Sequence, residues 1–315
     1  MLPAEFSLIA RHFAPLAGEA GLGLLDDAAV FTPPLGRQIV VTADAMVAGV
    51  HFPPDETPRF VGQKLLRVNL SDIAAMGAEP IGYLLTVSAP RGTADAWFAG
   101  FAEGLAADQR RYGVHLLGGD TTSTPGPITL SVTMFGHVAP GAAWRRSGAQ
   151  PGDELYVTGT IGDGVLGLAA VRGELPDPDG SLASRYRLPQ PRLNLALHGI
   201  VNAAMDVSDG LVQDAGHMAR ASGVALTIET ALVPVSAAGR AAGAAFVASG
   251  AAGGDDYELL LAVPPDRTVA LAEACAAAGV PVTRIGRFSL GPPDVIGVGV
   301  DGRKVPLGGG GWSHF

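Results

Sequence analysis

The sequence predicts a two-domain α/β protein. The chain has 315 residues, long enough for two domains of ordinary size, and 48% of them are hydrophobic, enough for a substantial core. β-Branched runs alternate with segments of helical periodicity in both halves. Between Ala139 and Asp153 the chain carries three glycines and two prolines. This composition predicts a domain boundary there, with one domain at 1–139 and the other at 150–315.

The first half is predicted to begin with a short amphipathic helix from Glu5 to Leu16, because its apolar residues recur at helical spacing. A glycine-led turn from Gly21 is expected to lead into a strand that ends near Val30. Further strands are predicted at 38–44, 83–88, 114–117 and 128–138, and helices at 59–72 and 94–112. The Gly-Gly-Asp-Thr-Thr sequence at 118–122 is predicted to be a turn.

The second half shows the same alternation of strands and helices. Strands are predicted at 155–158, 204–207 and 258–263, with short strands in the remaining segments. Helices are predicted after Gly164, from about 211 to 221, and from Asp266 to Ala278. Residues 175–191 are expected to form a loop-rich insertion.

The familiar nucleotide-binding signatures do not account for this chain. It contains no G-x-x-x-x-G-K-[ST] sequence and no protein-kinase signature set. A G-x-G-x-x-G pattern does occur at Gly297, Gly299 and Gly302, but no helical periodicity follows it. Because the dinucleotide pattern requires a strand, a turn and a helix, we interpret Asp301-Gly302 as a hairpin turn instead.

Charge and cysteine content narrow the function further. The net charge of −9 argues against a nucleic-acid partner, which calls for a basic face. The single cysteine, Cys275, lies in an alanine-rich helical run and is predicted to be a core residue. The chain has neither the pattern of a signal peptide nor a membrane-spanning run of apolar residues, so a soluble, cytoplasmic protein with no membrane partner is expected.

Acidic residues in apolar or glycine-rich surroundings are the feature that points to chemistry. Asp72 interrupts the apolar pattern of a predicted helix, where a buried carboxylate is costly unless cations or hydrogen-bond donors meet it. Similar acidic positions occur at Asp26-Asp27, Asp44, Asp120, Asp206 and Asp209. Mg²⁺ prefers such oxygen ligands and commonly bridges them to substrate phosphates. The alternative is that each acid only caps a helix or forms a turn.

Nine motifs in order closely resemble the thiamine-monophosphate kinase family of the aminoimidazole-ribonucleotide-synthetase-like superfamily. They are DDAAV at 26–30, TAD at 42–44, GVHF at 49–52, NLSDIAAMGA at 69–78, GGDTT at 118–122, RSGA at 146–149, GDELYVTG at 152–159, MDVSDGL at 205–211 and GGDDYEL at 253–259. The resemblance runs from Phe6 to Phe315, nearly the whole chain. It implies the two-domain fold of that superfamily, with an N-terminal domain that binds ATP and Mg²⁺ and forms a homodimer interface, and a C-terminal α/β domain that completes the phosphate and substrate site.

The resemblance also implies roles for individual residues. Those that match the family's Mg²⁺ ligands are Asp27, Thr42, Asp44, Asp72, Asp120, Asp206 and Asp209. Those that match positions near ATP are Tyr112, Gly119, Asp120, Arg146 and Ser208. Those that match positions facing thiamine monophosphate are His51, Asp255 and Trp312. On composition alone, a histidine such as His51 is more often structural, whereas Arg146 is equally consistent with a solvated charge and Trp312 with a surface-packed aromatic.

The implied reaction transfers the γ-phosphoryl group of ATP to thiamine monophosphate and gives thiamine diphosphate. The acceptor phosphate is already a nucleophile, so the protein must supply positioning and charge neutralisation, which several Mg²⁺ ions can provide. We expect direct in-line transfer without a catalytic side-chain nucleophile. Two alternatives remain open: another ATP-dependent enzyme of the superfamily, and a non-catalytic protein that binds nucleotide or thiamine phosphate. The chain departs from the family pattern at Leu25, Ala43 and Asp255.

Overall fold

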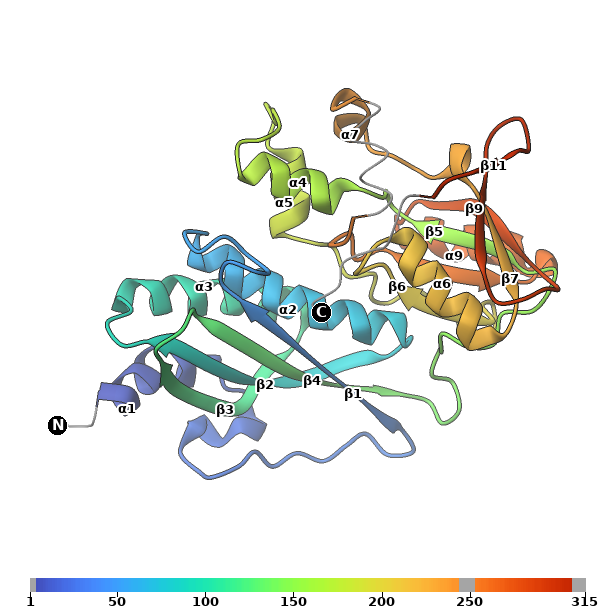
Figure 1. Ribbon diagram of the computed structural model, residues 1–315. Coiled ribbons are helices and arrows are strands. Elements are labelled where there is room, and N and C mark those ends of the chain that lie inside the picture. The colour runs from blue at the N-terminus through green and yellow to red at the C-terminus, as the bar shows by residue number, and fades with distance from the viewer. Residues whose placement is uncertain (1–3, 244–252, 308–315) are drawn as a thin grey trace. The chain divides into compact units, whose positions relative to one another are not determined.

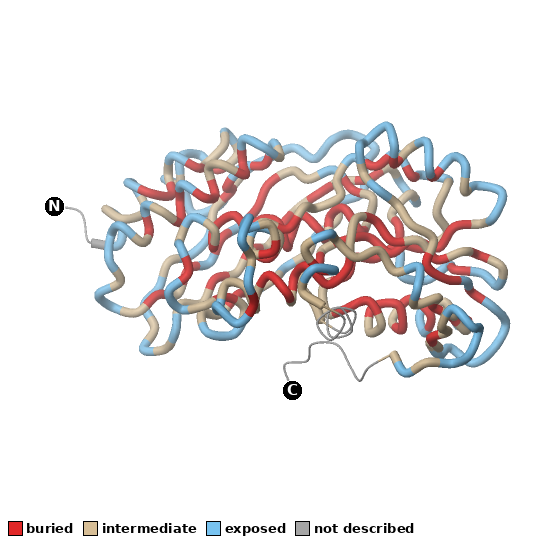
Figure 2. The backbone as a smooth tube through the Cα atoms, turned by 90° about the horizontal axis from the view of Figure 1, so that it is seen from above, coloured by how far each residue is buried: buried red, intermediate tan, exposed pale blue. Residues whose placement is uncertain are grey.

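The computed structural model describes residues 4–243 and 253–307, which form two compact units (Figure 1). The first unit comprises Met1–Ile73 and Ala78–Gly141, and the second comprises Ala74–Gly77 and Ala142–Phe315. In each unit, buried segments make up the interior and most loops are exposed (Figure 2). None of the helices among the described residues is both long and apolar enough to cross a membrane.

The N-terminal segment is a series of short helical pieces and not the single helix predicted from Glu5 to Leu16. These pieces are α1 (Ala4–Leu8), a π-helix (Ile9–Phe13) and 3₁₀ turns at Ala14–Leu16 and Glu19–Leu24. Pro15 has no N–H for helical pairing, which fits the break there. The strand predicted to end near Val30 is wrong, because the N–H of Val30 donates to the carbonyl of Ala20 and no β-ladder forms.

A four-stranded sheet in the order β1-β4-β2-β3 forms the body of the first unit. The strands are β1 (Gln38–Val47), β2 (Glu79–Pro90), β3 (His115–Thr124) and β4 (Thr129–Val138). Two long helices, α2 (Pro58–Ala75) and α3 (Asp95–Tyr112), cover one face of this sheet (Figure 1). Gly104 permits their close packing, because any larger residue would place a Cβ 2.1 Å from the carbonyl oxygen of Arg59.

The Gly-Gly-Asp sequence predicted as a turn lies inside β3 instead. Strand β3 continues through it in parallel register with β2, with a bulge that follows the Tyr83–Leu116 pair. The Gly119 position has no room for a side chain, because a Cβ there would lie 1.8 Å from the carbonyl oxygen of Leu85. Gly119 therefore allows close packing of β3 against β2, and Asp120 follows it within the sheet.

The face of this sheet opposite α2 and α3 is apolar and partly open. Ile39 and Val41 of β1 are 40% and 55% exposed, and Leu84 of β2 is 36% exposed. The loop before β1 covers part of this face, where the ring of Phe31 meets that of Phe135 edge-on at a centroid distance of 6.1 Å. In the sheet order, β4 lies between β1 and β2, so these exposed apolar residues lie on its two sides.

A seven-stranded sheet in the order β11-β10-β7-β9-β5-β8-β6 forms the centre of the second unit. Its strands are β5 (Glu154–Thr158), β6 (Ala203–Asp206), β7 (Ala225–Glu229), β8 (Leu259–Val263), β9 (Val282–Ser289), β10 (Val295–Val298) and β11 (Lys304–Val305). Its helices are α4 (Asp163–Val171), α5 (Ser181–Arg187), α6 (Leu211–Ser222), α7 (Ala237–Ala241) and α9 (Thr268–Ala277). The mixed α/β, two-domain fold class is confirmed.

Strand β8 shows why this sheet is buried on both faces. Leu260 and Ala262 pack in one core cluster with residues of α6, whereas Leu259 and Leu261 pack in a second cluster with residues of α9. Successive side chains of a strand point to opposite faces, so a run of five apolar residues fills both layers. Cys275 of α9 is fully buried in the second cluster, as its helical setting predicted.

Two sequence interpretations are settled in the second unit. The G-x-G-x-x-G pattern lies in the β10–β11 hairpin, where the N–H of Gly299 donates to the carbonyl of Arg303, so the hairpin interpretation is confirmed. The insertion at 175–191, predicted to be loop-rich, contains the short helix α5 between its loops. Asp177 accepts the N–H groups of Leu182 and Ala183 in the first turn of that helix, which satisfies donors that the helix leaves unpaired.

Candidate functional site

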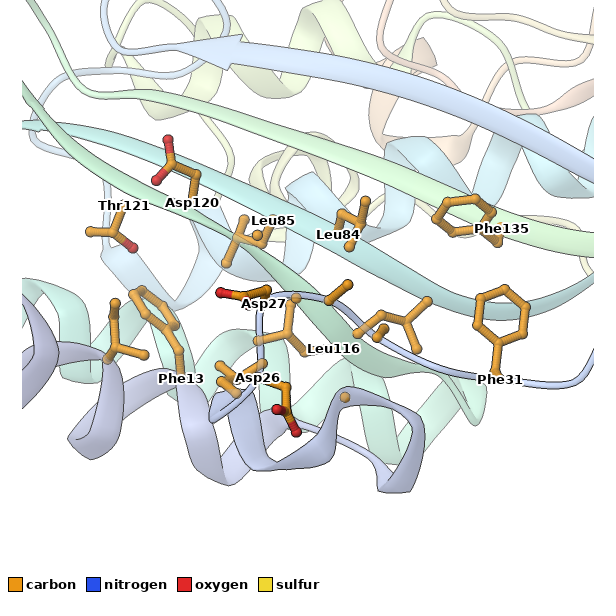
Figure 3. A pocket seen from close by; sticks show the side chains of 18 of the residues that line it. Phe13, Asp26, Asp27, Phe31, Leu84, Leu85, Leu116, Asp120, Thr121 and Phe135 are labelled. Carbon is orange, nitrogen blue, oxygen red and sulfur yellow. The ribbon is translucent and has the colours of Figure 1, made fainter.

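Three of the predicted site residues, Asp27, Gly119 and Asp120, line one pocket of about 610 Å³ in the first unit (Figure 3). The pocket lies on the open face of the sheet, between strands β2 and β3 and the N-terminal helical pieces. Its walls are largely apolar, with Phe13 at one end and Phe31 at the other. Two carboxylates at an apolar pocket can hold cations or donors of a bound molecule.

The backbone at Leu25, just before the Asp26-Asp27 pair, does not require a glycine. Leu25 has a φ of −105°, which any residue adopts, and its side chain is 90% exposed. The left-handed positions fall earlier, at Leu22, Gly23 and Leu24, with φ values of 50°, 66° and 57°. Backbone strain at non-glycine residues is common at functional sites.

A second group of predicted residues lies where β1 meets α2. The hydroxyl of Thr42 donates to Oδ2 of Asp72 at 2.5 Å, and the N–H of Asp44 donates to Oδ1 of Asn69 at 3.2 Å. Asp72 and Asn69 lie one helical turn apart on α2, so one helix face serves both strand residues. Asn69 is itself fixed by a bond to the carbonyl of Leu65. The arrangement orders oxygen atoms that suit a hard cation.

These two groups lie at opposite edges of the sheet. The register places Asp44, Val132, Leu85 and Gly119 in one row across β1, β4, β2 and β3. Three strand spacings separate the ends of this row, roughly 14 Å. Asp44 shares the helix-covered face with the buried Val132, whereas Asp120 shares the open face with Thr86. One Mg²⁺ ion, with ligand bonds of about 2.1 Å, cannot contact both carboxylates of the same chain.

His51 and Tyr112 occupy separate places in the first unit. Nδ1 of His51 accepts the N–H of Val47 at 2.9 Å, which leaves Nε2 as the protonated nitrogen of the neutral ring. Tyr112 ends α3, and its ring lies under the guanidinium groups of Arg67 and Arg111, at 5.7 and 5.3 Å from the ring centroid. Trp312, which is also predicted to face the substrate, lies outside the described residues.

In the second unit, Asp206, Ser208 and Asp209 lie together at the end of β6. The turn that carries them is organised by Asp214 of α6, whose Oδ2 accepts the N–H groups of Ser208, Asp209 and Gly210 at 3.0 to 3.1 Å. Burial raises the pKa of Asp214 to about 6, the nearby carboxylate of Asp209 adds to this, and the three N–H donors oppose it. Asp214 therefore holds the backbone of the turn.

Asp209, Asp214 and His217 bring ligand atoms within 4.8 Å of one another, a grouping that could hold a metal ion. Sequence reasoning selected only Asp209. Asp214 and His217 are three positions apart, the spacing that places side chains on one helix face, and this was the available signal. Burial lowers the pKa of His217, as do the charges of Arg220 and Arg146, while Asp209 raises it. The predicted Arg146 thus lies close enough to this group to act on it electrostatically.

Asp255 lies in the loop before β8, directly against the Asp206–Gly210 turn. Its N–H donates to the carbonyl of Ser208 at 2.9 Å, and the N–H of Tyr257 donates to the carbonyl of Val207 at 2.8 Å. Asp255 and Tyr257 both have left-handed backbone conformations, with φ values of 70° and 52°. The hydroxyl of Tyr257 donates to Oδ1 of Asp255 at 3.1 Å. The structure therefore groups Asp255 with three of the predicted phosphate-site residues.

Comparison with known proteins identifies the class. Two family descriptions match this chain: AIR synthase related protein, N-terminal domain, at residues 25–138, and AIR synthase related protein, C-terminal domain, at residues 150–298. The matched ranges include every predicted site residue except Arg146 and Trp312. The fold and the carboxylate groups thus define an AIR synthase related protein.

Individual relatives make this family assignment more specific. The thiamine-monophosphate kinase of Caulobacter vibrioides is 45% identical over 99% of this chain and 91% of its own length. The crystal structure of thiamine-monophosphate kinase from Stenotrophomonas maltophilia K279a is 38% identical, has a TM-score of 0.85, and the match covers 97% of this chain and 99% of that one. AaThiL complexed with AMPPCP and TMP is 30% identical with a TM-score of 0.79, covering 100% and 99%. The chain belongs to the thiamine-monophosphate kinase family.

Proposed function

We propose that this protein phosphorylates thiamine monophosphate to thiamine diphosphate with ATP as the phosphoryl donor. The observation that carries the proposal is the grouping of hydroxyl and carboxylate oxygens around Asp72, in a chain similar over its whole length to AaThiL complexed with AMPPCP and TMP. The bond between the γ-phosphorus and the β,γ-bridging oxygen breaks as an oxygen of the acceptor phosphate bonds to that phosphorus. ADP leaves with the electron pair.

The donor set fits Mg²⁺. The groups concerned are hard oxygens, and the bond between Thr42 and Asp72 shows that this carboxylate is already held in one orientation. We propose that the residues holding the ions are Asp27, Thr42, Asp44, Asp72, Asp120, Asp206 and Asp209. When bound, Mg²⁺ supplies the positive charge that lets two phosphate-bearing molecules approach.

The chain's own side chains bind and orient the two substrates. Gly119 and Asp120 line the pocket at β3, and we assign Tyr112, Gly119, Asp120, Arg146 and Ser208 to ATP. Arg146 can hold a phosphate by two parallel N–H bonds. We assign His51, Asp255 and Trp312 to thiamine monophosphate. No covalent intermediate is required, because the acceptor phosphate attacks directly.

We propose the domain roles that follow from this assignment. The domain at 1–139 binds ATP and Mg²⁺ and forms the dimer interface, and the domain at 150–315 completes the phosphate and substrate site. The enzyme works in the cytoplasm, where ATP is supplied.

We propose a homodimer that pairs through the open face of the first unit's sheet. Ile39 and Val41 on one side of β4, and Leu84 on its other side, expose apolar surface on this face, which is costly unless another surface covers it.

Substitution Val41→Glu tests the dimer. A charge on this apolar face should raise the dimer dissociation constant at least about 100-fold, the effect of losing one well-packed interface residue. Analytical ultracentrifugation of the full chain measures it. Val269→Glu is the control, because Val269 is 68% exposed on α9 in the second unit and should leave the association unchanged. Equal dissociation constants for both variants and the parent chain would contradict the proposed interface.

The function itself is tested by following product formation. The purified chain is incubated with ATP, Mg²⁺ and thiamine monophosphate, and thiamine diphosphate and ADP are quantified by phosphorus NMR. We expect the two products in equal amounts and none when Mg²⁺ is removed by a chelator. Binding of thiamine monophosphate and ATP without any thiamine diphosphate would instead identify a binding protein.

A further inference from the structure

The glycine-rich turn at Gly159–Gly164 leads into helix α4 and resembles a phosphate-binding loop, yet its N–H groups serve the protein itself. Oδ2 of Asp256 accepts the N–H of Gly162 at 2.7 Å, and Oδ1 accepts the N–H of Gly164 at 2.9 Å. Helix N-termini attract anions because their first N–H groups are unpaired and the helix dipole is positive there. Here a carboxylate of the same chain occupies that position, so no ligand phosphate is needed there.

Asp256 is buried, with 1% of its surface exposed, and it sits between two residues in unusual backbone conformations. Asp255 and Tyr257 have φ values of 70° and 52°, a region that costs an L-residue about 1–2 kcal/mol. Such a conformation persists only where the surroundings enforce it. Burial raises the pKa of Asp256 to about 8, and the two N–H donors oppose this by favouring the charged form.

Close packing around two glycines adds to this restraint. A Cβ at Gly164 would lie 2.4 Å from the carbonyl carbon of Asp255, and a Cβ at Gly254 would lie 2.2 Å from the carbonyl oxygen of Ser208. Three segments therefore meet with no space between their backbones: the start of α4, the loop at 253–258, and the turn after β6. The carboxylate of Asp256 joins the loop at 253–258 to the start of α4 by two hydrogen bonds.

From this geometry we infer that Asp256 is a positioning residue, which fixes the backbone of Asp255 against the start of α4 and thereby sets the affinity for the phosphate acceptor. The inference rests on the proposed function, in which Asp255 contacts thiamine monophosphate. The inference also predicts different effects on the affinities for the two substrates. The Ser208–Gly210 turn has its own three N–H bonds to Asp214, so loosening the 253–258 loop should leave the ATP side largely intact.

Asp256→Asn tests the inference, because the amide keeps the size of the side chain but turns an N–H₂ group toward a backbone N–H. We expect KM for thiamine monophosphate to rise about tenfold or more, since a misplacement of about 1 Å can cost up to 100-fold, and KM for ATP to change less than about threefold. Deuterium uptake in peptides covering Gly253–Leu259 should increase. Asp163→Asn is the matched control: Asp163 is also buried at the start of α4, but its carboxylate accepts from Thr160 and Ser236.

Gly164→Ala gives a second route if Asp256→Asn does not fold. Alanine in place of glycine normally favours a helix by up to about 1 kcal/mol, but here its Cβ displaces the Asp255 backbone, so the same selective rise in KM is expected. Unchanged KM for thiamine monophosphate in both variants, or an equal rise for Asp163→Asn, would overturn the inference while the kinase assignment stands. Unaltered deuterium uptake at 253–259 in Asp256→Asn would also overturn the positioning role. If the unmodified chain makes no thiamine diphosphate, it is the proposed function that fails.

Discussion

Replacement of Asp72 by Asn is expected to lower the rate of thiamine diphosphate formation on the order of a thousand-fold, because a metal ion contributes several kcal/mol of transition-state stabilisation. The amide oxygen can still accept the hydroxyl hydrogen of Thr42, so the β1–α2 contact and the fold should survive. Initial rates at saturating ATP, Mg²⁺ and thiamine monophosphate measure the loss, and circular dichroism verifies the fold.

Asp95→Asn is the control for this substitution. Asp95 is an aspartate of the same unit that begins α3 and pairs with Arg11 and His12, and it is exposed and away from the proposed ligands. Its replacement should leave the rate within about twofold, as expected for a surface charge pair. Turnover by Asp72→Asn equal to that of Asp95→Asn would remove Asp72 from the metal site.

Glu258→Gln is expected to give the largest loss of stability. The carboxylate of Glu258 is fully buried, and it accepts hydrogen bonds from Arg185 at 2.8 Å, from Nε and Nη2 of Arg192 at 2.6 and 2.5 Å, and from Thr158 at 2.7 Å. Removal of one partner from a buried ion pair costs about 3–5 kcal/mol, because the remaining charges lose their compensation. Hydrogen exchange in peptides of β8 should report this lowered free energy of local unfolding.

Arg284→Met provides the contrast within the same unit. Like Glu258, Arg284 pairs with two residues of opposite charge, Glu154 and Glu229. Its side chain and theirs, however, are 20% to 38% exposed. Partly exposed pairs contribute about 0–1 kcal/mol, so this variant should barely change exchange in β8. A double variant, Glu258→Gln with Arg192→Met, should cost less than the sum of its two single changes, since the residues interact directly. Additive costs would contradict a coupled cluster.

The parts of the fold that follow local rules could be predicted from the sequence. Helix α2 and strand β4 were predicted within a few residues because their periodicities are regular over a long stretch. Strand β3 was predicted to stop before Gly118, because two adjacent glycines normally signal a turn. The register with β2 decides otherwise: a side chain at Gly119 would strike the backbone of Leu85, a tertiary requirement that no local pattern reveals.

The acidic residues of the candidate site could be predicted from the sequence, but which of them lie together in space could not. Acidic residues in apolar surroundings drew attention to Asp72 and Asp120, yet only strand order and register place them in different groups. Asp214 and Asp256 were missed, because each acts on backbone N–H groups of a turn, at Ser208–Gly210 and at Gly162–Gly164, a role that depends on the folded backbone and leaves no local sequence pattern. A search for buried acids at helix starts and glycine turns would have found both.

The central claim is that these carboxylates hold divalent cations beside the phosphates of both substrates. Anomalous diffraction from crystals of the full chain, grown with Mn²⁺ in place of Mg²⁺, a non-hydrolysable ATP analogue and thiamine monophosphate, tests it most directly. We predict anomalous peaks within bonding distance of Asp72, Asp27 and Asp120. A fully occupied ternary complex with no metal bound to any of these three side chains would contradict the account.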